Sequence, residues 1–449
     1  MISRRFFLSS AATATFAGLV RPGFAAPSTT VFDGATILDG QSGELRRNWR
    51  LVVSGEAIAA IGPAASVQAP PGAQVVTLDG ATVLPGIVSD HVHLGAYHGT
   101  TSGPAAQNVD VILQQLALYT DFGVTTVASM GTNSAIVYEL RRRIRNGDLR
   151  GADFLVADRG IGVPKGAPPV TVGADQLDRP ETVDQAREAV RSAVSRGADV
   201  IKLWLDDFQG AKLVKMAPEI YSAVIEEAHR NNKQVVAHIY YLEDAKALLR
   251  AGADVLGHGV RDQRVDAEFM ALMQERGAWY IPTLGVDEAF YRFAEAPNTL
   301  DDPFVRKALH PDLVAQFQTS AWRDQQLGNP ALPQWKAGLQ HNLANTKLLF
   351  EQGLNVGFGT DSGAMPLRVP GYGEHRELEL LVQAGLTPLQ AIRLATEKGA
   401  AAMKLHDRGV LLAGKRADFL IVDGDPSQSV SVLRQIRGVW AGGRRVSSA

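Results

Sequence analysis

Short apolar runs alternate with segments of helical periodicity along most of the chain, between residues 81 and about 400. The runs at 124–129, 200–204 and 235–238 are apolar at nearly every position, and a helical stretch follows most runs of this kind. Strands that are buried on both faces and alternate with helices are typical of a parallel sheet. The pattern has eight such units up to residue 359, which predicts an α/β fold with a (β/α)8 TIM barrel.

The two ends of the chain have a different texture. Short strand-like runs at 30–32, 49–54, 57–62 and 74–78 are separated by Gly and Pro turns, and further strands are expected at 414–422 and 438–446. Such spacing indicates an antiparallel sheet. We therefore expect a small β-sandwich built from residues 27–84 and 401–449, which flank a barrel over 85–400.

Two connections inside the predicted barrel are unusually long. Residues 161–180 carry four prolines, and residues 285–335 carry seven aromatic side chains. Connections of this length in a compact domain are usually functional. We interpret 285–335 as a lid over an active site, with a surface appendage as the alternative.

The first 26 residues have the pattern of an export signal. Arg4 and Arg5 precede Phe6, and a mildly apolar run follows at 11–20. This arrangement resembles a twin-arginine signal peptide. It predicts a periplasmic or secreted protein that engages the twin-arginine translocation machinery.

Composition narrows the possible chemistry. The chain of 449 residues has no cysteine, so disulfides, a thiol nucleophile and thiolate metal ligands are excluded. A formal net charge of −2 without a basic patch gives no reason to expect a nucleic-acid partner. No run is long and apolar enough to predict a membrane span. Homo-oligomers remain possible, and a small molecule is the expected partner.

Polar residues of metal-binding type stand at the ends of five predicted strands. In a barrel, the carboxyl ends of the strands form one rim, where active sites lie. Two histidines spaced two apart on a strand point to the same side and can meet one ion. Each residue alone has a structural explanation, such as a helix cap for an aspartate. Together they predict one metal site, formed by His91, His93, Lys202, His238, His258 and Asp361.

Several motifs resemble the metal-dependent amidohydrolase superfamily, in its imidazolonepropionase-like and prolidase-like branch. They include Leu84-Pro85-Gly86 before His91, Gly359-Thr360-Asp361, and the run Gly414-Lys415-Arg416-Ala417-Asp418. The resemblance covers essentially all of residues 28–449 and implies a barrel with an attached β-sandwich. It also implies two divalent metal ions, with zinc as the default, bridged by an N-carboxylated Lys202.

By the same resemblance, one ion takes His91, His93 and Asp361, and the other takes His238 and His258. A single ion with an unmodified Lys202 is the alternative. Two such ions lower the pKa of bound water and polarise a carbonyl, so attack by hydroxide is expected. We assign Asp361 as the proton carrier. Tyr240 is a candidate for hydrogen bonding to the substrate carbonyl or oxyanion, with packing beneath the lid as the other interpretation.

These features predict hydrolysis of a C–N amide bond in a dipeptide, an N-acyl amino acid or a similar small molecule. A cyclic amide, lactone or carbamate hydrolase with the same site is the second hypothesis, and a metal-free binding scaffold is the third. Tyr241 stands where related deaminases carry a glutamate, which disfavours deamination. Arg261 is a candidate for pairing with a substrate carboxylate or forming a salt bridge. No specific role follows for His98, His375 and Glu377.

Overall fold

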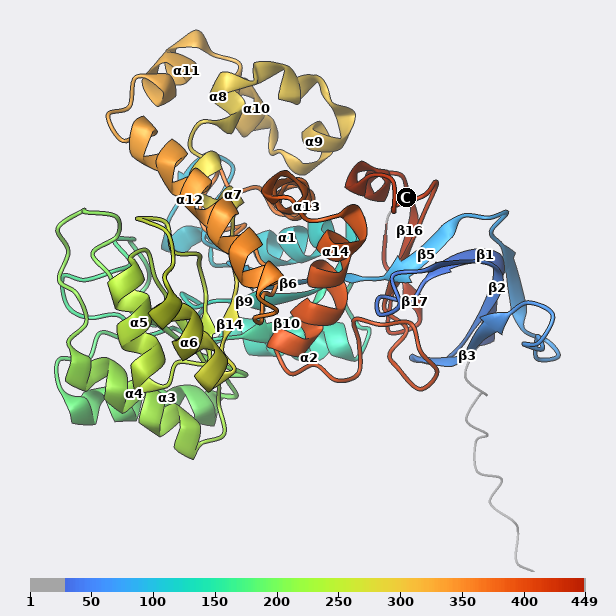
Figure 1. Cartoon of the computed structure of the whole chain (residues 1–449), viewed down its shortest axis with the longest axis horizontal. Helices are drawn as coiled ribbons and strands as arrows, with labels where there is room; N and C mark the ends of the chain where they lie inside the picture. Colours follow the sequence, from blue (N-terminus) through green and yellow to red (C-terminus); the bar gives the residue numbers. More distant parts are fainter. Residues whose placement is uncertain (1–28, 448–449) are drawn as a thin grey trace, which may run out of the picture.

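The computed structural model describes residues 29–447, so the predicted signal peptide at 1–26 lies outside the described residues. A β-sheet lies at one end of the molecule, and an α/β body forms its centre (Figure 1). A group of short helices stands above that body in the same view. Within residues 29–447, no helix is both long and apolar enough to span a bilayer.

Strands from both ends of the chain pair in one sheet. Its order is β17-β16-β15-β5-β1-β2-β3, with β4 paired to β1. The N-terminal strands are β1 (Thr29–Leu38), β2 (Leu45–Ser54), β3 (Ala57–Pro63), β4 (Gln74–Thr77) and β5 (Thr82–Pro85). The C-terminal strands are β15 (Phe419–Val422), β16 (Ile436–Ala441) and β17 (Arg444–Arg445). Phe32 packs edge-on against Phe419 and Trp440 at ring-centroid distances of 5.1 Å, so residues from both ends form one core. The exact domain boundaries stay a prediction.

The central strands are parallel, which confirms the α/β class. One sheet has the order β10-β9-β6 and another β11-β12-β13-β14. Their bounds are β6 (Ile87–Val92), β9 (Val124–Ser129), β10 (Asp153–Val156), β11 (Ile201–Trp204), β12 (Val235–His238), β13 (Val255–Leu256) and β14 (Trp279–Tyr280). Val356 forms a parallel bridge to Tyr280, and Ser362 forms one to Val92. The Asp199 N–H donates to the Val156 carbonyl, which connects the two sheets.

The apolar run over 81–88, from which we expect a single strand, is divided between the two parts of the molecule. Residues 82–85 pair with the terminal strands as β5, and β6 begins the parallel sheet at Ile87. Gly86 stands between them, where a Cβ atom would lie 2.2 Å from Thr125 Oγ1. A glycine is required there because the chain passes so close to the neighbouring strand.

Helices separate the parallel strands and cover them (Figure 1). Thr182 begins one of these helices with a capping box to Gln185, and Gly197 ends it at φ 97°. The helices of this body are α1 (Val109–Asp121), α2 (Ile136–Arg145), α3 (Val183–Arg196), α4 (Pro218–Arg230), α5 (Leu242–Ala251), α6 (Ala267–Arg276), α12 (Leu332–Glu351), α13 (Tyr372–Ala384) and α14 (Pro388–Arg393). Smaller elements are β7 (Tyr97–His98), β8 (Thr101–Ser102), η1 (Pro104–Ala106), η3 (Leu394–Lys398), α15 (Gly399–Ala402) and η4 (Val430–Arg434).

Residues 285–335 are largely helical, although their sequence has the appearance of a long loop. They form α7 (Gly285–Glu288), α8 (Arg292–Glu295), η2 (Pro297–Asp301), α9 (Pro303–Ala308), α10 (Pro311–Phe317) and α11 (Ser320–Leu327), and they run into α12. Phe293 stacks on Phe317 at 4.8 Å, and Trp322 lies 4.5 Å from Phe317. These aromatic residues thus form a small core together with Phe122 and Tyr372 from other segments. Helices α8 to α11 lie above α12 and α13 in Figure 1.

Candidate active site

The structure brings the six predicted metal-binding residues together. His91 is the last residue but one of β6, Lys202 lies in β11, and His238 is the last residue of β12. The nearest approaches are 3.4 Å from Lys202 Nζ to His91 Nε2 and 3.1 Å from His93 Nε2 to Asp361 Oδ1. His258 places its ring centroid 4.4 Å from those of both His91 and His238. All six residues are buried.

Hydrogen bonds to the backbone and to neighbouring side chains orient three of these histidines. His91 Nδ1 donates to the Gly257 carbonyl at 2.5 Å, which leaves Nε2 toward Lys202 and Asp361. His258 Nδ1 is held 2.9 Å from Thr283 Oγ1, so its Nε2 is also available. Metal-binding histidines in proteins generally have their second nitrogen held in this way.

His238 is held by the opposite nitrogen. Its Nε2 lies 3.4 Å from Oδ1 of Asp206, a fully buried carboxylate. Burial opposes ionisation of Asp206, but His238 and the Phe208 N–H hold the pKa of this carboxylate below its ordinary value. The second oxygen, Oδ2, has no hydrogen-bond partner among residues 29–447. The arrangement leaves Nδ1 of His238 for a metal ion.

The segment that carries Asp361 is under backbone constraint. Asp361 has φ 58°, a left-handed conformation that is uncommon for residues other than glycine and is often found at functional sites. Its N–H donates to the His91 carbonyl at 2.8 Å. Gly359 precedes it, and a Cβ atom there would lie 2.8 Å from His91 N. The glycine of the Gly-Thr-Asp motif therefore permits the close approach of Asp361 to His91 and His93.

The pKa values of Lys202 and Asp361 are shifted by different surroundings. Burial lowers the pKa of Lys202 to about 7, so a large fraction of its amine is neutral near neutral pH. Burial alone would raise the pKa of Asp361, but the Arg368 guanidinium holds it well below its usual range. Arg368 forms an ion pair with Asp361 Oδ2. Burial also lowers the pKa of His91 and of His258, so both rings are neutral, as metal ligands must be.

A cavity of about 500 Å³ opens above this cluster. His93, His238, His258 and Asp361 line it, whereas His91 and Lys202 are fully buried. Both long connections contribute to its walls. Their apolar lining residues are Pro168, Pro169, Val170, Val172, Val286, Phe290 and Trp335, and Thr171 and Gln176 add polar groups. The cavity therefore combines a polar floor with a largely apolar wall.

The remaining predicted residues lie at varied distances from this cavity. Arg261 lines it, but its guanidinium donates to Asp287 at 2.9 Å in a buried ion pair. Tyr240 is nearly buried, and its hydroxyl accepts a hydrogen bond from Gln334 at 3.2 Å. This bond leaves the Tyr240 O–H free to donate, but Tyr240 is not among the residues that line the cavity, and the oxyanion role stays a prediction.

Three polar residues without an assigned role make contacts elsewhere. His98 packs against His310 beside the short helices, with ring centroids 5.0 Å apart. His375 Nε2 donates to the Phe122 carbonyl at 2.8 Å. Glu377 accepts hydrogen bonds from the N–H groups of Leu284 and Gly285. None of the three lines the cavity.

Sequence reasoning missed Asp206, Thr283 and Arg368. Asp206 was detectable as a further acidic residue just after the strand that carries Lys202, where the other predicted site residues also lie. Thr283 and Arg368 lie in irregular segments, for which no periodic rule predicts the direction of a side chain.

The donor set suits a divalent metal ion. His91, His258 and Asp361 each offer one ligand atom, and these atoms lie within 4.8 Å of one another. Imidazole nitrogen and carboxylate oxygen are common zinc ligands. A neutral Lys202 amine at the same place can take up CO2 to give an anionic carbamate. The residues present therefore fit the two-ion site that the resemblance implies.

Comparisons with known proteins agree with this geometry. An ochratoxinase from Aspergillus niger is 25% identical over 92% of this chain and 86% of its own length. An imidazolonepropionase from Micrococcus luteus is 27% identical over 93% of this chain and 99% of its own length. The crystal structure of an Xaa-Pro dipeptidase with bound methionine has a TM-score of 0.74 at 24% identity, covering 94% of this chain and 100% of that chain.

The amidohydrolase family profile matches residues 82–446, which is most of the chain. The match spans the parallel strands, the cluster of predicted metal-binding residues and the C-terminal part of the terminal sheet. The chain belongs to the amidohydrolase family.

Proposed function

We propose that the protein is a metal-dependent hydrolase that cleaves a C–N amide bond in a small substrate, such as a dipeptide or an N-acyl amino acid. The observation that carries this proposal is the convergence of His91, His258 and Asp361 within 4.8 Å beneath a cavity of about 500 Å³. The family match supports hydrolysis of a C–N bond. The proposal includes a closed (β/α)8 barrel, which the bridges of residues 356 and 362 to β14 and β6 support.

Two divalent ions, with zinc as the default, would occupy this site. We assign His91, His93 and Asp361 to one ion and His238 and His258 to the other, with a carbamate on Lys202 between them. When bound, the ions would supply a lowered water pKa and polarisation of the substrate carbonyl. The burial of Lys202 and its 3.4 Å approach to His91 support its place between the two groups of ligands.

Asp361 would move the proton of the reaction. Its Oδ1 faces the cavity floor beside His93 Nε2, within reach of a water molecule that attacks from the cavity. From that position it would accept the proton and return it to the leaving nitrogen. The apolar walls would exclude other water and strengthen these electrostatic interactions.

The test is metal analysis combined with a substrate screen on the mature chain, which here means the protein without the predicted signal peptide at 1–26. We expect two metal equivalents per chain and hydrolysis of at least one dipeptide or N-acyl amino acid. The screen should include lactones, because a lactone-only activity would contradict the amide assignment. A protein without metal and without activity after metal loading would contradict the hydrolase itself.

Carboxylation of Lys202 needs its own measurement. Protein prepared with 13C-labelled bicarbonate should show one carbamate 13C signal, and Lys202→Arg should abolish it and reduce the metal content.

Export through the twin-arginine pathway is also part of the proposal. Replacement of Arg4 and Arg5 by lysine should leave the protein in the cytoplasm of the producing cell.

A further inference from the structure

Arg368 is the one arginine of the cavity wall whose charge is paired with a predicted metal ligand. Its side chain is 10% exposed, and its guanidinium pairs with Asp361 Oδ2. A second N–H donates to the Val286 carbonyl at 3.2 Å, and Nε has no partner within the part of the chain that the structure describes. The other arginine of the cavity, Arg261, is already balanced by Asp287.

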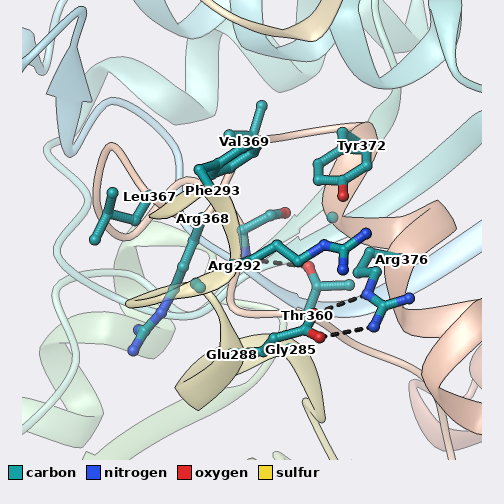
Figure 2. A pocket seen from close by; sticks show the side chains of 13 residues that line it. Gly285, Glu288, Arg292, Phe293, Thr360, Leu367, Arg368, Val369, Tyr372 and Arg376 are labelled. Atoms are coloured by element: carbon teal, nitrogen blue, oxygen red, sulfur yellow. Dashed lines mark hydrogen bonds and ion pairs between the residues drawn. The ribbon is translucent and has the colours of Figure 1, made fainter. Parts of the chain in front are cut away.

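The Arg368 side chain points away from the ion pair between Arg376 and Glu288. Figure 2 shows Arg376 joined to Glu288, while the Arg368 side chain extends in a different direction from the same group of residues. Arg368 also lines the large cavity, as Asp361 does, so its side chain borders the space in which a molecule above Asp361 would lie.

An aromatic surface lies next to this guanidinium. The Arg368 side chain stands over the Phe290 ring at 5.5 Å, and Phe290 stacks on Trp335 at 4.3 Å with planes 15° apart. Both rings line the cavity. A flat apolar group bound against them would hold any attached charged group close to Arg368.

The charges around Arg368 indicate which kind of charged group would bind there. Under the proposed function, Asp361 donates its electron pairs to a metal ion and becomes a weaker partner for Arg368. A buried guanidinium without a full counter-charge is unfavourable, and its planar fork matches a carboxylate. We propose that Arg368 binds a substrate carboxylate that is attached to a flat apolar group packed on Phe290 and Trp335. This inference rests on the proposed function and specifies the substrates as anionic amides.

Ligands without an amide bond test the inference apart from turnover. Phenylacetate has both features, phenylethanol lacks the charge, and acetate lacks the ring. Their binding to the metal-loaded mature chain can be measured by titration calorimetry. We expect phenylacetate to bind at least tenfold more tightly than either of the other two.

Variants locate the effect. Arg368→Gln should reduce phenylacetate binding to the level of phenylethanol, with phenylethanol binding and metal content unchanged. Trp335→Leu should weaken phenylacetate and phenylethanol but not acetate. Arg292→Gln is the matched control, because Arg292 lies on the side of the small cavity drawn in Figure 2 and does not line the large cavity.

Unchanged phenylacetate binding in Arg368→Gln would overturn the inference, since the carboxylate would then be held by the metal ions alone. Equal binding of phenylacetate and phenylethanol to the wild type would also overturn it. Failure of the proposed function gives a different result, namely a chain that holds no metal or hydrolyses no amide.

Discussion

Asp206 Oδ1 lies 3.4 Å from His238 Nε2, and both side chains are buried. A carboxylate on one nitrogen of a histidine fixes the tautomer and makes the other nitrogen a stronger metal ligand. We predict that Asp206→Asn lowers metal affinity by about 10- to 100-fold at the position of His238, as loss of such partners commonly does. Competition with a chromophoric chelator measures the affinity.

Asp207→Asn provides the control for this variant. Asp207 is the next residue and accepts hydrogen bonds from the Tyr241 hydroxyl and the Gly210 N–H, away from His238. Its replacement should leave both metal affinities unchanged. Equal metal affinities in Asp206→Asn and the wild type would show that the carboxylate does not act through His238.

The role of Asp361 predicts a separation between metal binding and turnover. In Asp361→Asn an amide oxygen still faces His93 but can no longer carry a proton at neutral pH. We expect kcat to fall by about 10²- to 10⁴-fold, the usual contribution of a general base, while most of the metal remains bound. Steady-state kinetics with metal analysis of the same sample tests this, with the exposed Asp324→Asn as control. An active Asp361→Asn enzyme would contradict the assignment.

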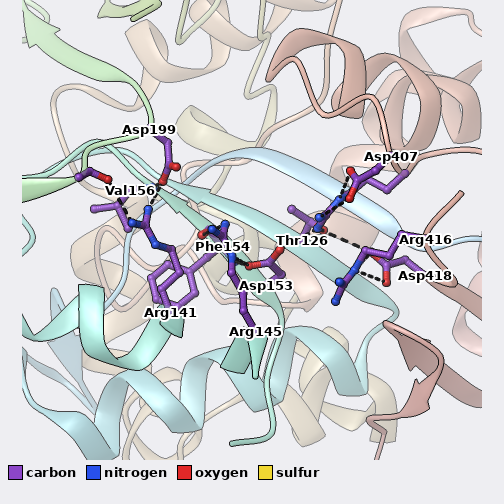
Figure 3. Close-up of polar contacts among 12 residues, drawn as sticks. Thr126, Arg141, Arg145, Asp153, Phe154, Val156, Asp199, Asp407, Arg416 and Asp418 are labelled. Carbon is purple, nitrogen blue, oxygen red and sulfur yellow. Dashed lines mark hydrogen bonds and ion pairs between the residues drawn. The ribbon is translucent and has the colours of Figure 1, made fainter. Parts of the chain in front are cut away.

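A buried network of arginine–aspartate ion pairs connects the terminal sheet to the parallel strands (Figure 3). Arg408 is 8% exposed and donates to Asp153 Oδ2 of β10 at 2.9 Å. It also lies 3.7 Å from Asp418, which precedes β15. Figure 3 shows that Asp153 and Asp418 each keep a second arginine, Arg145 and Arg416 respectively.

We predict that Arg408→Met lowers the free energy of unfolding by about 3 kcal/mol, the lower end for a broken buried pair, because each carboxylate retains one partner. Urea unfolding monitored by tryptophan fluorescence gives the value. Arg393→Met removes an exposed pair with Glu397 and should change stability by about 0.5 kcal/mol or less. If the two variants were equally stable, the network would be unimportant for holding the two parts together.

His375 predicts an acid-sensitive contribution to stability. Burial lowers its pKa from 6.5 to about 4, although its hydrogen bond to the Phe122 carbonyl opposes the shift. Between these values the unfolded chain binds a proton that the folded chain does not, so stability falls as the pH drops from 6.5 to 4. The effect reaches about 1.4 kcal/mol per pH unit and levels off below pH 4.

His375→Gln can keep the donor to Phe122 and does not titrate. We expect the wild type to lose up to about 3 kcal/mol of stability relative to this variant on going from pH 7 to pH 4. Urea unfolding at a series of pH values measures the difference. A constant difference over this range would mean that folding does not shift the pKa of His375.

Much of the parallel-sheet body was predictable from local pattern. Apolar runs such as 235–238 can be buried on both faces only in a covered parallel sheet, and the histidine that ends this run then stands at the rim. Lys202 was predictable from its place in an apolar strand, and Asp361 from its place just after the apolar run 356–359, although it lies on no strand itself. The side-chain direction on a strand follows from its two-residue period, without knowledge of distant contacts.

The tertiary structure alone decided how these groups are supported. Gly257 and Thr283, which orient His91 and His258, act through a carbonyl and a hydroxyl whose direction depends on how β13 and β14 pack beside β6 and β12. Aromatic residues of 285–335 looked like loop residues because their partners, among them Phe122 and Tyr372, are distant in sequence. Arg368 meets Asp361 across an irregular turn that has no period to interpret. The sequence by itself determined which residues could carry the chemistry, because strand periodicity is local, and packing between distant segments determined which atoms face the cavity.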